Sequence, residues 1–114
     1  MTPRVDKKLY FSADGKTVTV TGPIGPWAGD EAAAVFSVVV SQTGNGDGPI
    51  TAIGTSTITY EPGQGYWTAQ ARVTRDAMQF QQGKAKARAW ATIAKPGGGA
   101  ESYKWTVKTK LVEA

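Results

Sequence analysis

The chain has 114 residues and carries thirteen Lys and Arg against nine Asp and Glu, which gives a formal net charge of +4 at pH 7. It contains neither Cys nor His, and this excludes disulfides, thiolate nucleophiles, Ser-His-Asp triads and zinc sites of the usual Cys/His kind. The length is typical of a single domain, 1–114, whose core is large enough to fold without a structural metal.

Glycine and proline divide the sequence into seven short segments rich in Val, Thr, Ile, Tyr and Trp, which is the composition of β-strands. We predict a tight hairpin turn at Ala13-Asp14-Gly15, between the first two segments. The fourth segment either continues through Gly54 or breaks there. In chain order, the predicted strands are 7–12, 16–21, 33–42, 51–60, 66–74, 84–95 and 102–112.

The third segment holds a nearly continuous apolar run, residues 35–40. Such a run predicts a central strand that is covered on both faces, or a strand at an interface. Helical periodicity is hard to find elsewhere. Residues 30–34 have room for one turn of helix, and we interpret residues 75–82 as an irregular crossover between sheets rather than as a second turn.

Side chains alternate across a strand, and this alternation predicts the core. One face of the sixth segment is a row of alanines, which indicates that bulky aromatic side chains from a facing sheet pack above it. The opposite face of the same segment carries cations. The predicted core is Val18, Val20, Phe36, Val38, Val40, Ile58, Trp67, Ala87, Ala89, Trp105 and Val107.

Several short strands separated by regularly spaced turns predict an all-β sandwich or barrel. The unequal strand lengths and two long crossing loops favour the sandwich. We therefore predict a single antiparallel β-sandwich domain of about seven strands.

Three short motifs resemble those of bacterial immunoglobulin-like domains. Gly65-Tyr66-Trp67 matches the Gly-x-Trp that opens a middle strand in these modules, and Phe80-Gln81-Gln82-Gly83 matches the element before their penultimate strand. Val18-Thr19-Val20-Thr21-Gly22 resembles their opening strand. The chain lacks the Asp-x-x-Gly-Asn signature of the calcium-binding members and the Cys…Trp…Cys pattern of antibody-type domains. The resemblance implies an immunoglobulin-like sandwich used for adhesion, spacing or ligand presentation, outside or on the surface of a cell, and no reaction.

The outward faces of the sixth and seventh segments carry the candidate binding residues. If these segments form a hairpin, their cations gather on one sheet face around an aromatic ring, where lysines would contact phosphates or sulfates and the ring would stack on a base or sugar. The alternative is a solvated face whose lysines deter edge pairing. The residues are Lys84, Lys86, Arg88, Trp90, Lys104, Lys108 and Lys110.

A further candidate is Trp27, which ends the Gly- and Pro-rich stretch 22–26. It is either an anchor for a protein or carbohydrate partner or a plug at one end of the core. Asn45 and Asp47 fall short of the six to eight oxygens that calcium prefers, so we interpret 44–48 as a flexible turn.

The composition leaves little basis for catalysis, because the acidic residues lie mostly in turns and no spacing places two of them across a cleft. We expect no enzyme, cofactor or metal, and no apolar run is long enough to span a membrane. The leading hypothesis is a non-catalytic interaction module with a protein or polysaccharide partner. The alternatives are a polyanion or nucleic-acid binding β domain that uses the lysine-rich face, and a structural subunit that assembles by pairing its third strand between chains. The ligand, the compartment and the oligomeric state stay open.

Overall fold

The computed structural model describes residues 4–23, 33–43, 49–59, 66–75, 77–94 and 99–114. These residues form seven strands with bounds close to the predicted ones, so the all-β prediction is confirmed. No helix in the described part of the chain is long and apolar enough to cross a membrane. The strands are β1 (Lys8–Phe11), β2 (Thr17–Pro23), β3 (Ala33–Thr43), β4 (Pro49–Thr59), β5 (Tyr66–Val73), β6 (Gly83–Ala94) and β7 (Ala100–Glu113).

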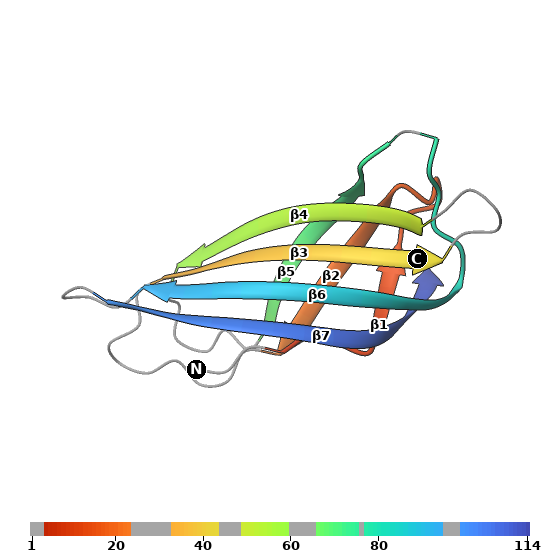
Figure 1. Ribbon diagram of the computed structural model, residues 1–114. Helices are drawn as coiled ribbons and strands as arrows, with labels where there is room; N and C mark the ends of the chain where they lie inside the picture. Colours follow the sequence, from red (N-terminus) through yellow and green to blue (C-terminus); the bar gives the residue numbers. More distant parts are fainter. Residues whose placement is uncertain (1–3, 24–32, 44–48, 60–65, 76, 95–98) are drawn as a thin grey trace.

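The strands form one closed barrel in the order β1-β2-β5-β4-β3-β6-β7, so the prediction of two separate sheets is wrong (Figure 1). β7 returns to β1 through the one parallel pairing among the described strands, and all other neighbours are antiparallel. Two short ladders close the ring. β1 and β2 pair at Tyr10↔Thr19 and Phe11↔Val18, and β4 and β5 pair at Ala52↔Val73 and Ile53↔Arg72.

Gly54 explains how the β4–β5 corner closes without breaking β4. A Cβ atom on this residue would lie 2.0 Å from the backbone oxygen of Gln70 in β5, so only glycine permits the close approach of the two strands. β4 continues through Gly54 to Thr59. The predicted choice between a break and a continuous strand is thereby settled in favour of continuity.

The N-terminal segment crosses from β2 to β7 and closes the other side of the barrel. The Arg4 amide donates to the Pro23 carbonyl at 3.0 Å, and the Asp6 amide donates to Thr21 at 2.8 Å. One residue later the Lys110 amide donates to the Lys7 carbonyl at 2.8 Å. The parallel β1–β7 ladder then begins at Lys8.

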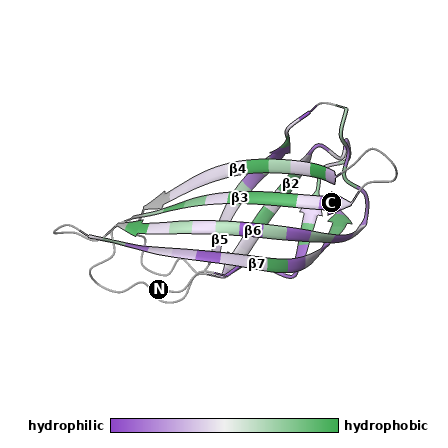
Figure 2. Cartoon of the chain, viewed as in Figure 1, coloured by the Kyte–Doolittle hydropathy of each residue, from purple (hydrophilic) through white to green (hydrophobic). Residues whose placement is uncertain are grey.

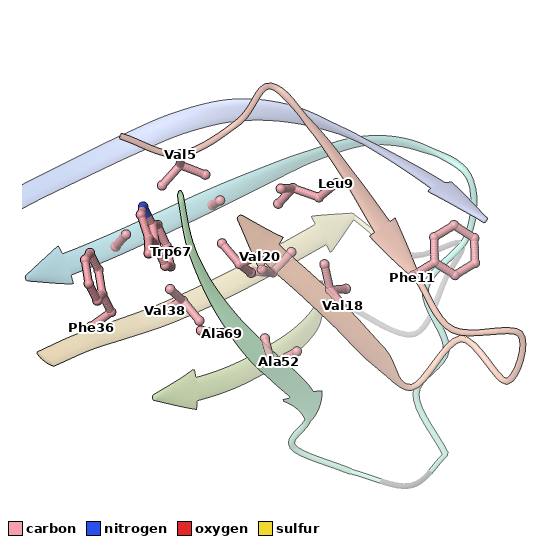
Figure 3. Packing of buried hydrophobic residues seen from close by; sticks show 14 of the residues in the cluster. Val5, Leu9, Phe11, Val18, Val20, Phe36, Val38, Ala52, Trp67 and Ala69 are labelled. Carbon is pink, nitrogen blue, oxygen red and sulfur yellow. The ribbon is translucent and has the colours of Figure 1, made fainter. Parts of the chain in front are cut away.

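The barrel interior holds Phe36 and Trp67, two of the aromatic side chains that the alternation placed there (Figure 3), together with alanines of β6. The Phe36 ring of β3 stacks on the Trp67 ring of β5 with 4.3 Å between centroids and 7° between planes. Trp67 is 1% exposed, and its Nε1 donates to the Arg4 carbonyl at 2.7 Å. The predicted core residues that are buried are Val18, Val20, Phe36, Val38, Val40, Trp67, Ala87 and Ala89.

Two predicted core residues lie nearer the surface than expected. Trp105 and Val107 are half-buried and pack against the edge of the core. Trp105 stacks on Tyr103, two residues away on the same strand, with 6.3 Å between ring centroids. This part of β7 lies beyond the four residues that β1 pairs, so one side of the strand lacks that cover. The side chain of Ile58 lies outside the described residues.

The described residues between β5 and β6 contain turns and bends, which confirms the predicted irregular crossover. Gln42, at the end of β3, holds this segment in place. Its Nε2 donates to the Gln81 carbonyl at 2.7 Å, and its Oε1 accepts from the Gln81 amide at 2.9 Å. The crossover also delivers the buried Phe80 to the core.

A basic hollow on the outer face

β6 pairs with β7 along its whole length, and this brings the predicted cations together. Lys84 lies opposite Lys110, Lys86 opposite Lys108, and Trp90 opposite Lys104. All five lysines are exposed, and so is Arg88, which lies between Lys86 and Trp90 along β6. The predicted hairpin is confirmed, whereas Trp27 lies outside the described residues, as do Asn45 and Asp47.

The structure adds two lysines that the sequence analysis did not place here. The parallel β1–β7 ladder sets Lys8 beside Lys110, and Lys7 lies one residue before β1. The missed signal is the pair Lys7-Lys8 at the start of the first strand. Its position on this face depends on the parallel pairing of the first and last strands, which no local pattern in the sequence indicates.

Six cationic side chains line a hollow of about 620 Å³ at the end of β3, the start of β6 and the end of β7. Polar and small residues complete its wall. None of the described residues that line the hollow is acidic, and β3, β4 and β6 contain no Asp or Glu at all. Figure 2 shows the hydrophilic segments at this end of β6 and β7. The cationic lining residues are Lys7, Lys84, Lys86, Arg88, Lys108 and Lys110.

An apolar strip lies next to the basic hollow on the same face of the sheet. Across the strands, Arg88 is level with Val39 of β3, and Val39 is level with Ile53 of β4. Ile53 is 56% exposed, while Val39 is half-buried. Trp90 continues the strip two residues beyond Arg88, beside Ser37. We define the apolar strip as Val39, Ile53 and Trp90.

Trp90 already holds a cation in the free protein. The Lys104 Nζ lies 5.9 Å from the centroid of its ring, within the range of a cation–π contact. The ring is half-buried, so part of it remains open to water. An aromatic surface therefore lies at the end of the row of cations.

The basic face is unfavourable for the stability of the free fold. Like charges directly opposite each other across an antiparallel pair are destabilising, and this face holds two such pairs in consecutive rows. Lys8 beside Lys110 adds a third close approach. An anion bound among these side chains would relieve the repulsion.

The described residues offer no alternative centre for metal chemistry, since they contain no group of three or more acidic side chains able to hold an ion. The basic hollow and the adjoining apolar strip are the candidate site, because they bring cations and apolar side chains together on one face of the sheet.

Comparisons with known proteins do not assign a family. No family model matches the sequence, and no curated protein matches it either. Among solved structures, the chain is similar to murine CRIg, with a TM-score of 0.44 and 12% sequence identity over 97% of each chain. None of these findings supports the bacterial part of the resemblance described above. What the structure defines is the class, a seven-stranded all-β barrel with a basic outer face.

Proposed function

We propose that this protein is a non-catalytic binding domain whose ligand is a polyanion held on the β6–β7 face. The observation that carries the proposal is the alignment of Lys84 with Lys110 and of Lys86 with Lys108. Folding alone does not favour such pairs, and each would be stabilised by an anion between the two strands. These lysines line the hollow, which takes its cations from β6, from β7 and from Lys7 before β1. None of its described lining residues is a competing carboxylate.

We also propose that the chain is an immunoglobulin-like domain. In such domains strands B and E are neighbours, strands C, F and G form the other group, and an additional strand C′ joins that group in the variable type. Here β2 pairs with β5, β3 and β7 flank β6, and β4 pairs with β3. This neighbour pattern supports the resemblance in the sequence, while the β1–β7 and β4–β5 pairings, which join the two groups into one barrel, are the departure from it.

Binding of inorganic polyphosphate tests the polyanion proposal, because this polymer presents anionic groups without sugars, bases or acyl chains. Isothermal titration of the full chain should give an affinity that falls steeply between about 50 mM and about 200 mM salt. The double variant Lys86→Gln/Lys108→Gln should bind markedly more weakly, since it removes one complete cation pair from the hollow.

The matched control is Lys16→Gln/Arg75→Gln, which removes the same charge from outside the hollow. If the control weakens binding as much as the hollow variant does, binding follows net charge and the site assignment fails. If the wild-type chain does not bind polyphosphate even at low salt, the proposed function is wrong.

A further inference from the structure

We propose that the polyanion is a single-stranded nucleic acid, whose phosphates follow the cations of β6 and β7 and whose bases lie on the apolar strip. This inference rests on the proposed function and names its ligand. It is carried by the placement of two unlike surfaces side by side on one sheet face. The basic hollow lies at the end of β3, the start of β6 and the end of β7, and Val39, Ile53 and Trp90 lie beside it on β3, β4 and β6.

The dimensions of the basic surface fit a single polymer chain. Outward residues on a strand recur every second position, so successive rows of cations are about 6.6 Å apart, comparable to one extended sugar–phosphate unit. The rows run from Lys84 to Trp90, a span of about 20 Å along β6. β6 and β7 together are only two strands wide, which gives a narrow track.

The apolar strip distinguishes a nucleic acid from a polymer that is anionic on all sides. A single strand has phosphates along one edge and flat, weakly polar bases along the other. Arg88 lies at the boundary between the row of cations and the apolar strip, because it is level with Val39 and Ile53 on one side and with Thr106 on the other. A sulfated polysaccharide presents no separate apolar edge to this strip.

The hollow also favours a polymer chain over a membrane surface as the ligand. Lys86, Lys108 and Lys110 line a recess of about 620 Å³, into which a phosphodiester chain can enter. An anionic bilayer is a broad surface and would leave the recess unfilled. Lysines and a tryptophan on one face fit both partners, so the recess is the feature that favours the polymer.

Trp90 and Lys104 form the contact on which a base would stack. In the free protein the Lys104 ammonium lies 5.9 Å from the Trp90 ring centroid. When a base stacks on the ring, it takes the place of the Lys104 ammonium. The flexible lysine side chain can then turn to the neighbouring phosphate. The contact recognises any base, because every base offers a π face.

The experiment compares two ligands with the same phosphates, a twelve-nucleotide oligothymidylate and the corresponding abasic strand. The full chain should bind the thymidylate about fivefold or more tightly than the abasic strand, and the thymidylate should quench tryptophan fluorescence. Trp90→Leu should abolish this preference, while Trp90→Phe should retain part of it. Each of Lys84→Gln and Lys86→Gln should make the salt slope of binding less steep by about 0.7.

Several results would overturn the inference while leaving the proposed function intact. These are equal affinity for the thymidylate and abasic strands, tighter binding of a heparin dodecasaccharide or of a twelve-base-pair duplex, and tighter binding to phosphatidylserine vesicles. If polyphosphate and both oligonucleotides fail to bind, the inference and the proposed function are both wrong. Because the ligand comparison uses the wild-type chain, it stays decisive even if Trp90→Leu does not fold.

Discussion

Trp67 links three parts of the molecule. Its ring stacks on Phe36 across the barrel, and its Nε1 donates to the Arg4 carbonyl in the N-terminal segment. Gly22 makes room for this contact, since a Cβ there would lie 1.6 Å from the Arg4 oxygen. The side chain therefore couples the core to the segment that leads into β1, and so to the lysines at the edge of the basic face.

Trp67→Ala should destabilise the fold by about 3–5 kcal/mol, because it removes a fully buried aromatic side chain. Trp67→Phe should cost less, since it keeps the stack and loses the hydrogen bond to Arg4. Trp105→Ala should also cost less than Trp67→Ala, because Trp105 is only half-buried. Equilibrium unfolding in urea measures all three. Equal losses for Trp67→Ala and Trp105→Ala would contradict this description of the core.

At the scale of the strands, β6 divides its two faces between stability and binding. Its inward alanines accept the aromatic side chains of the barrel, while its outward positions carry Lys84, Lys86 and Arg88. β7 places its own cations opposite them. The backbone pairing of the hairpin holds like charges opposite each other on its outer face. A bound anion would reduce the repulsion between them.

Lys86→Glu should stabilise the free protein at low salt by roughly 0.2–1 kcal/mol, because it turns a repulsive pair with Lys108 into an attractive one. The gains of Lys86→Glu and of Lys108→Glu should not add in the double variant Lys86→Glu/Lys108→Glu, since that pair again carries like charges. Thermal unfolding of the four proteins forms a double-mutant cycle. High salt should reduce the coupling energy between positions 86 and 108, because it screens the charges. A cycle with no coupling at low salt would mean that the two lysines do not repel each other.

At the scale of the whole molecule, the barrel closes through two ladders of only two residue pairs each. The longer ladders join β3 to β4 and β6, and β6 to β7. Over Ala33–Ser41, β3 is paired on both edges, so the hypothesis that this strand pairs between chains is wrong. Its outer face still exposes Val35, which is 45% accessible. The face is thus open to a ligand while the edges are satisfied.

The sequence predicted those features that depend on neighbouring residues and could not predict those that depend on distant ones. Alternation placed Trp67 inside and Lys86 outside, and the turn residues gave the strand bounds. Closure of the ring could not be foreseen, because it depends on how closely β4 approaches β5 at Gly54. The place of Lys7 and Lys8 beside Lys110 could not be predicted for the same reason, because it follows from a parallel pairing of opposite ends of the chain.

The most direct test of the account is a map of backbone amide chemical shifts during titration with oligothymidylate. We expect the largest changes in Lys84–Trp90 and Lys104–Lys110, with smaller ones in Val39 and Ile53. The strands β2 and β5, which lie in the other part of the barrel (Figure 1), should change little. Changes concentrated in β2 and β5, or spread evenly over the barrel, would contradict the claim that the face of opposed lysines is the binding surface.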